Sequence, residues 1–248
     1  GTFPFLLVPF MIFLTGNLKN KLKSKNYIIP LVRGLIFVPL PFIAFTALKN
    51  ITLPEFTTLN MATPIFATLL SFFFLKEKLN GFQIVSLLFG LTGVVLVVQP
   101  GFANFNSYFI IVLIGSFLLT LTTLIVNKYS TTISTEGYFI YGGIPIHLIC
   151  LVCFIFDPIL LEIIPLILIV CASIMVDSAI FLIVYVFQRS QKFYSSISCL
   201  IYLQILWSVL IGHFIFNEYL NPFALAGATF ISLSGFLSIL AQKKQLRK

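Results

Sequence analysis

Long apolar stretches alternate with short polar gaps along almost the whole chain. A helix rises about 1.5 Å per residue, so about twenty apolar residues cross a hydrocarbon core about 30 Å thick. A shorter apolar run at 3–16 precedes the runs of this length. The membrane-length runs are 30–48, 54–75, 81–99, 107–126, 137–156, 163–187, 193–216 and 223–241. The pattern predicts an all-α polytopic membrane protein.

Basic residues are concentrated in every second gap between these runs. The first, third, fifth and seventh gaps and the C-terminal tail hold nearly all of them, and Arg33 lies beside the first gap. The remaining gaps hold one lysine, Lys49. Lysine and arginine are enriched in cytoplasmic loops, so the basic gaps and the C-terminus are expected on the cytoplasmic side.

Composition excludes a soluble protein. The chain is 59% hydrophobic and 9% charged, whereas a soluble domain is about 25% charged. The net charge of +8 is explained by membrane-flanking lysines, so nucleic acid is not an expected partner. Cys150 and Cys153 have CxxC spacing, but without a second such pair they are better explained as small apolar residues than as a redox or metal site.

A weak internal repeat organises the runs. The segment 75–82 resembles 216–223 at a shift of 141 residues, which superposes Glu77 on Glu218. Each copy lies between the fourth and fifth helix of its half, which predicts two repeats, 1–102 and 103–248. Five helices per repeat is an odd number, so the second repeat enters the membrane from the opposite side. This is the inverted repeat of many secondary transporters.

The repeat also predicts that the first half is incomplete. The counterpart of the start of the second half would lie roughly 35 residues before Gly1 by the same shift. The intact fold would then have ten helices, of which about eight and a half are present. Gly1 in place of a methionine agrees with an N-terminally truncated chain.

Three segments resemble the EamA-type branch of the drug/metabolite transporter (DMT) superfamily. They are Leu31-Val32-Arg33-Gly34-Leu35, the stretch from Ala47 through Thr63-Pro64 to Leu79, and Gly90 to Leu96, with a looser match at Phe214 to Glu218. The resemblance implies a ten-helix carrier of the inner membrane with both ends cytoplasmic. Family members move amino acids, metabolites, nucleotide-linked compounds or drugs, and S-adenosylmethionine carriers resemble the chain at Arg33-Gly34.

Three polar residues fall near the predicted membrane midplane: Asp177, His147 and Gln204. A charged group at that depth is costly and usually faces a cavity or a partner. We expect Asp177 to bind a cationic part of a substrate or a coupling proton, although a structural pairing with a neighbouring helix is the alternative. His147 is a candidate partner for it, or a helix–helix hydrogen-bonding residue.

Aromatic and amide side chains near the same depth suggest a binding surface. Tyr202 and Trp207 flank Gln204, and Asn60 lies on the equivalent helix of the first repeat. Amides beside aromatic rings suit a planar or amino-acid-like solute. Packing and interfacial roles are the alternative for the aromatic residues.

Three prolines interrupt predicted helices and are candidate hinges. Pro39 and Pro41 lie within the run 30–48, and Pro64 lies near the middle of 54–75. Proline removes a backbone donor and frees a carbonyl, which bends a helix. A static bend is equally compatible with this pattern.

These features favour a secondary transporter that moves a small polar or amphipathic metabolite by alternating access. No phosphate-binding loop, zinc spacing or catalytic triad is present in the sequence, so neither an enzyme nor a cofactor is expected. The expected partners are the lipid bilayer, a small-molecule substrate and a coupling proton or ion, and a homodimer stays open. The alternative is an inactive truncated remnant or a non-transporting membrane partner protein.

Overall fold

The computed structural model describes residues 22–23, 26–51, 53–76, 81–98, 107–156, 162–190 and 193–204, with isolated positions and adjacent pairs between 207 and 240. Every regular element within these residues is helical. In chain order they are α3 (Ile28–Phe37), α4 (Pro39–Leu48), α5 (Leu53–Asn60), α6 (Thr63–Leu70), the π-helix η1 (Ser71–Leu75), α7 (Gly81–Val98), α8 (Tyr108–Lys128), α9 (Thr135–Phe156), α10 (Ile163–Ser190), α11 (Tyr194–Ser198) and the 3-10 helix η3 (Cys199–Tyr202).

Four spans in the described part are long and apolar enough to cross a membrane: Ile28–Leu48, Tyr108–Lys128, Thr135–Phe156 and Ile163–Ser190. In the last of these, 11% of the most apolar window is buried by protein. A helix that keeps its apolar side chains on the outside is suited to lipid rather than water. The predicted all-α polytopic membrane class is therefore confirmed.

The run predicted as one helix over 54–75 is broken between α5 and α6, and α6 continues directly into the π-helical turn η1. The chain leaves α5 at Asn60, turns at 61–62 and re-enters a helix with Pro64 in the first turn of α6. The run ends at Lys76 in the left-handed region with φ of 53°. Proline is tolerated in a first turn, where its missing N–H would have no helical acceptor, so Pro64 follows the break rather than bending a continuous helix.

The chain folds into two compact units. Unit 1 comprises Gly1–Pro39 and Leu121–Gln191, and unit 2 comprises Leu40–Thr120 and Lys192–Lys248. Each unit thus draws on both halves of the sequence. The repeat signatures around Glu77 and Glu218, and the run 3–16, lie outside the described residues. The repeat boundary at 102/103 therefore stays a prediction.

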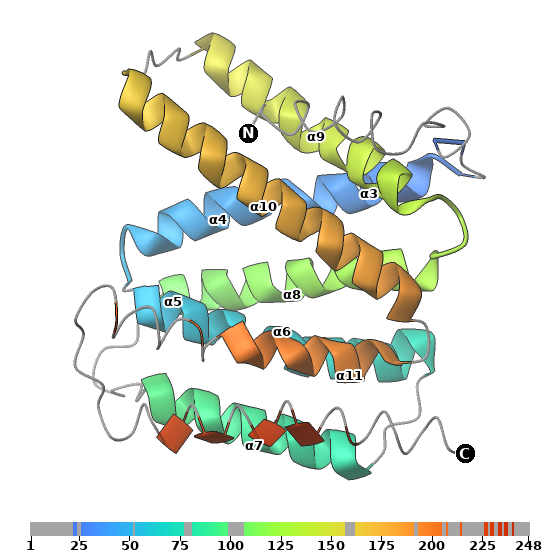
Figure 1. Cartoon of the computed structure of the whole chain (residues 1–248), viewed down its shortest axis with the longest axis vertical. Helices are drawn as coiled ribbons and strands as arrows, with labels where there is room; N and C mark the ends of the chain where they lie inside the picture. Colours follow the sequence, from blue (N-terminus) through green and yellow to red (C-terminus); the bar gives the residue numbers. More distant parts are fainter. Residues whose placement is uncertain are drawn as a thin grey trace. The chain divides into compact units, whose positions relative to one another are not determined.

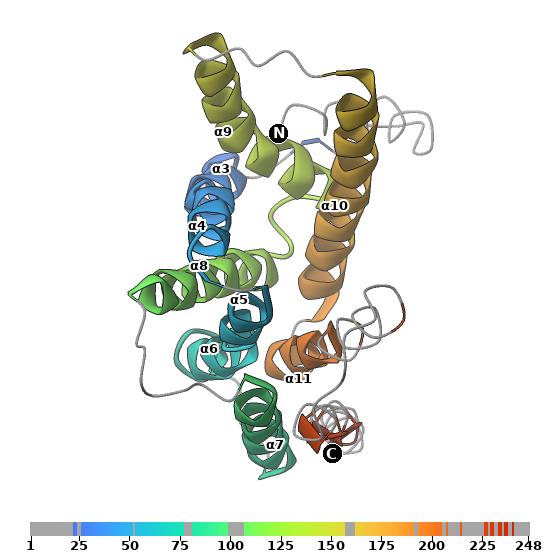
Figure 2. The same cartoon turned by 90° about the vertical axis from the view of Figure 1, so that its left-hand side faces the viewer.

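Unit 1 is built on α9. Helix α3 lies along α9, and α10 packs against it from another side (Figures 1 and 2). The α3–α9 approach is close because glycines meet: a Cβ added to Gly34 would lie 2.3 Å from the carbonyl oxygen of Gly142. Small residues of this kind let membrane helices pack backbone to backbone.

Unit 2 combines a small apolar core with polar contacts between helices. Ala47, Ile51 and Val112 form the buried core, and α6 contacts α11. Gln83 of α7 donates from Nε2 to the hydroxyls of Ser195 (2.9 Å) and Ser196 (2.8 Å) of α11. Because the hydrocarbon core of a bilayer offers no hydrogen-bond partners, polar groups buried between membrane helices are commonly satisfied by neighbouring helices.

Candidate functional site

Asp177 lies halfway along α10, on the face that the helix buries. The other buried positions of α10 are Val184, Phe187 and Ser190, which follow at helical spacing. Asp177 is 7% exposed, and its Oδ2 has no hydrogen-bond partner among the described residues. A buried carboxylate without a partner is unfavourable, and in a membrane helix this arrangement is typical of a ligand or ion site.

His147 is buried in α9, one turn after Gly143. Its ring Nδ1 donates a hydrogen bond to the Gly143 carbonyl oxygen. This bond orients the ring, and a neutral imidazole then carries its lone pair on Nε2. This hydrogen bond lies within α9, whereas the alternative expectation for His147 was a hydrogen bond between helices, and both expected roles stay predictions.

The structure does not join Asp177 to His147: within the described residues no hydrogen bond or ion pair links the two side chains. Contacts between α9 and α10 occur toward the start of α9, where the rings of Phe139 and Phe181 meet edge to face at 5.8 Å. The two helices diverge from there toward the end of α9 (Figure 2). A similar depth along the two helices therefore does not by itself bring the Asp177 carboxylate next to the His147 imidazole.

Asn60 belongs to a helix–helix network in unit 2. The hydroxyl of Ser116 donates to Asn60 Oδ1 at 3.1 Å, and the hydroxyl of Thr63 donates to the Asn60 carbonyl oxygen at 2.6 Å. The side chain is half-buried. These bonds tie the end of α5 to α8 and to the start of α6.

The aromatic candidates near Gln204 lie on different sides. Tyr202 is fully buried, and its hydroxyl has no hydrogen-bond partner in the part of the chain that is described. Its ring covers Gly90 of α7, where an added Cβ would lie 2.2 Å from Cε2. Gln204 is exposed, as is Trp207 at 63%. Tyr202 is therefore separated from the surface that Gln204 and Trp207 present.

The candidate hinges lie at helix breaks. Pro39 opens α4 directly after the interruption at Val38, and Pro41 occupies the first turn of the same helix. The boundary between the two compact units also falls after Pro39. A further proline, Pro145, which was not among the predicted hinges, lies inside α9, beside Gly34 of α3.

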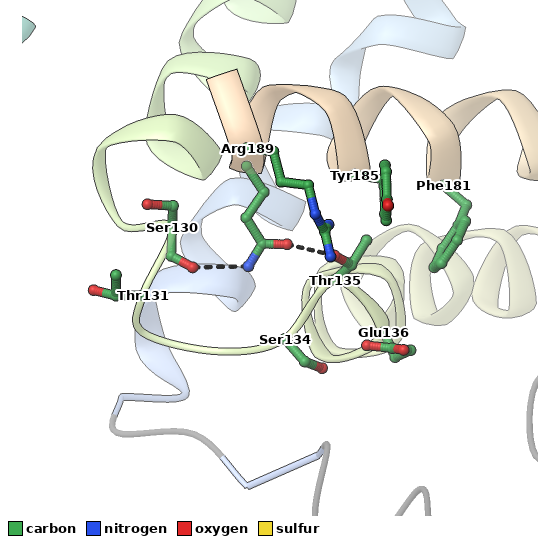
Figure 3. Close-up of a pocket in the computed structure, with 9 residues that line it drawn as sticks. Ser130, Thr131, Ser134, Thr135, Glu136, Phe181, Tyr185 and Arg189 are labelled. Carbon is green, nitrogen blue, oxygen red and sulfur yellow. Dashed lines mark hydrogen bonds between the residues drawn. The ribbon is translucent and has the colours of Figure 1, made fainter. Parts of the chain in front are cut away.

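A polar pocket of about 550 Å³ lies where the turn between α8 and α9 meets the end of α10 (Figure 3). Its polar and aromatic lining carries one acidic and one basic side chain. The lining residues are Ser130, Thr131, Ser134, Thr135, Glu136, Phe181, Tyr185, Gln188 and Arg189. The Arg189 guanidinium stacks over the Tyr185 ring at 3.7 Å, which leaves its edge available for hydrogen bonds.

Gln188 holds the wall of this pocket together. Its Nε2 donates to the carbonyl oxygens of Ser130 (2.8 Å) and Ile133 (2.6 Å), and its Oε1 accepts from the Thr135 hydroxyl at 2.5 Å. Two of these bonds are drawn in Figure 3. All donors of the amide are used, so the turn is fixed to α10.

No residue predicted from the sequence lines this pocket. The sequence feature that could have indicated the pocket is a polar segment, 127–136, together with the polar pair Gln188 and Arg189, which follows it after two predicted helices. The charge pattern predicts loops on the cytoplasmic side for both segments. The closure of an antiparallel helix pair brings these two ends together, and sequence spacing does not report which side chains then meet.

Comparison with known proteins agrees with the arrangement described. Residues 2–99 match the model of the EamA-like transporter family. A solved crystal structure of a protein that is 15% identical has the same fold, with a TM-score of 0.76 over 98% of this chain and 85% of that chain.

Two relatives cover nearly the whole chain. S-adenosylmethionine uptake transporters of Rickettsia bellii (strain RML369-C) and Rickettsia conorii (strain ATCC VR-613 / Malish 7) are each 23% identical over 98% of the chain, which spans 82% and 81% of their lengths. The match of residues 2–99 to this family, the two relatives and the apolar helices support a multi-pass membrane transporter that resembles the EamA-like transporters.

Proposed function

We propose that the chain is a secondary carrier for a small polar or amphipathic metabolite of the amino-acid or S-adenosylmethionine type. The observation that carries the proposal is the Asp177 carboxylate, buried and without a hydrogen-bond partner to Oδ2 among the described residues, midway along a membrane-length helix. A cationic group of the solute, or a coupling proton, would satisfy the carboxylate.

The substrate class is supported by two independent considerations. The relatives are named S-adenosylmethionine uptake transporters, and S-adenosylmethionine carries a sulfonium, an ammonium and a carboxylate group. The pocket of about 550 Å³ with Glu136 and Arg189 falls in the size range of small-molecule sites, about 300–1,000 Å³. We assign it as the entrance on the cytoplasmic side.

Transport by alternating access requires two parts that move around a site. We propose that the repeats 1–102 and 103–248 are these parts, that Pro39, Pro41 and Pro64 are hinges, and that the C-terminus is cytoplasmic in an inner membrane. Exposed Gln204 and Trp207 would contact solute, while Asn60, Tyr202 and His147 would position the helices. An ion or solute gradient would supply the energy.

The test is uptake of radiolabelled S-adenosylmethionine and a panel of amino acids into proteoliposomes that contain the chain, with Asp177→Asn alongside. We expect saturable wild-type uptake and at least about a tenfold loss in the variant, because the neutral amide attracts neither a cation nor a proton. Unchanged uptake by Asp177→Asn would remove Asp177 from the mechanism. Absence of wild-type uptake for every solute would favour the alternative, a non-transporting protein.

A further inference from the structure

A second buried charge lies in unit 1, on a different helix from Asp177. Arg33 is the sixth residue of α3 and lies within the apolar span Ile28–Leu48. The residue is 5% exposed, and its Nε is buried without a hydrogen-bond partner among the described residues. The positive-inside argument placed this arginine beside a cytoplasmic loop, whereas protein covers it in the structure.

Glycine on α9 makes the space for the guanidinium. A Cβ added to Gly142 would lie 2.9 Å from Arg33 Nη1. The arginine therefore lies across the bare backbone of α9, where Gly34 and Gly142 already bring the two helices into backbone contact. Any larger residue at position 142 would occupy the place of the guanidinium.

Snorkelling does not explain this position. An arginine near the end of a membrane helix usually extends its side chain toward the interface, so that the guanidinium reaches water and headgroups. Such a side chain would be exposed on the protein surface. Arg33 is instead covered by protein.

The groups around Arg33 do not neutralise it. The ring of Phe37 lies 5.8 Å from Cζ. The nearby Tyr138 is fully buried and already donates its hydroxyl to the Tyr129 carbonyl oxygen at 2.8 Å. No ion pair joins Arg33 to Glu136, Glu162 or Asp177 in the described part of unit 1. A buried cation without a counter-charge is unfavourable, so the site is chemically complete when an anion is present.

We propose that Arg33 binds the carboxylate of the transported solute. The planar guanidinium presents paired N–H donors that match the two oxygens of a carboxylate. The inference rests on the proposed function and narrows its substrate class. The selected solute therefore carries an unmodified carboxylate, as an α-amino acid or an α-amino acid derivative does.

The test compares S-adenosylmethionine with its decarboxylated analogue as competitors of labelled S-adenosylmethionine uptake by the full chain in proteoliposomes. We expect wild type to prefer the carboxylate-bearing competitor by about tenfold to a hundredfold, the range for a charge-assisted bond to a buried partner. In Arg33→Gln this preference should vanish. S-adenosylmethionine then loses the bond between its carboxylate and Arg33, and the decarboxylated analogue never had it. Arg33→Lys should retain part of it, since a lysine keeps the charge and loses the paired geometry.

Lys128→Gln is the matched control, because it removes one positive charge from an exposed position at the end of α8. It should keep the wild-type preference. Wild-type uptake with the full preference retained in Arg33→Gln would overturn the role of Arg33 and leave the proposed function intact. If both competitors bind Arg33→Gln more weakly by the same factor, so that the preference between them is unchanged, the role of Arg33 would also be overturned. A merely structural role of the arginine would have that result. No uptake by wild type would refute both proposals.

Discussion

Single glycines decide how closely helices approach in this protein. At Gly90 of α7 the ring of Tyr202 occupies the place that a Cβ would take, with Cε2 at 2.2 Å. Tyr202 is fully buried, so its ring cannot simply turn outward into solvent. The contact between α7 and η3 therefore depends on the missing side chain.

We predict that Gly90→Ala destabilises the protein by about 1–3 kcal/mol, the usual result of overpacking a filled interior. The measurement is the unfolding midpoint in detergent. Gly81→Ala is the matched control in the same helix, because a Cβ there would meet no atom within 4 Å. The double variant Gly90→Ala/Tyr202→Ala should be no less stable than Tyr202→Ala alone, and an additive loss would contradict the steric explanation.

Buried polar residues divide into satisfied and unsatisfied groups, and this separation bears on function. Gln83 and Asn127 are buried and have hydrogen-bond partners on neighbouring elements. Arg33 and Asp177 each retain a buried polar atom without one among the described residues. Satisfied groups hold helices together, whereas unsatisfied charges are completed by ligands or ions. Composition alone does not separate the two groups.

At the scale of elements, the span Ile28–Leu48 is interrupted because two prolines follow each other closely. Pro39 and Pro41 cannot donate to the carbonyl oxygens of residues 35 and 37, four positions earlier. The N–H of Val38 still reaches the carbonyl oxygens of Gly34 (3.1 Å) and Leu35 (3.3 Å). The helix therefore ends and restarts within one turn, at the boundary of the compact units.

We predict that Pro39→Ala/Pro41→Ala makes α3 and α4 continuous, raises the thermal midpoint and lowers the maximal uptake rate several-fold with little change in KM. The two restored hydrogen bonds stabilise the straight helix by about 0.5–1.5 kcal/mol each, and a stiffer hinge slows the conformational step rather than binding. An unchanged maximal rate together with a raised midpoint would identify the prolines as a static bend.

At the scale of the whole molecule, the charge pattern predicts which loops face the cytoplasm. Lys128 ends α8 in a basic gap, and Lys49 follows α4 in the opposite set of gaps. Both residues are exposed. The positive-inside rule places Lys128 in the cytoplasm and Lys49 outside.

Cysteine labelling tests this orientation. In a background without the four native cysteines, Lys49→Cys should react with a membrane-impermeant thiol reagent in intact cells. Lys128→Cys should react after the membrane is opened. The reverse pattern would invert the topology and with it the assignment of the pocket to the cytoplasmic side.

Much of the fold was predictable because hydropathy is a local property. Apolar runs of sufficient length predicted the spans around α3 and α4, α8, α9 and α10, and these are present. The run 54–75 was predicted as one helix and is broken, because hydropathy does not report where backbone hydrogen bonds are lost. The depth of Asp177 and His147 followed from counting residues along their helices, whereas the separate surroundings of the two side chains did not.

The amino-acid sequence by itself determined the all-α polytopic membrane class of the chain and the family that it resembles, since both follow from composition and order along the chain. The burial of Arg33 against Gly142, the pocket held by Gln188 and the cover of Tyr202 over Gly90 were decided by tertiary structure. The physical reason is that these features join helices distant in sequence. The free-energy cost of burying a charge depends on the groups that tertiary packing places around it. Those groups therefore also decide whether the charge can bind a ligand.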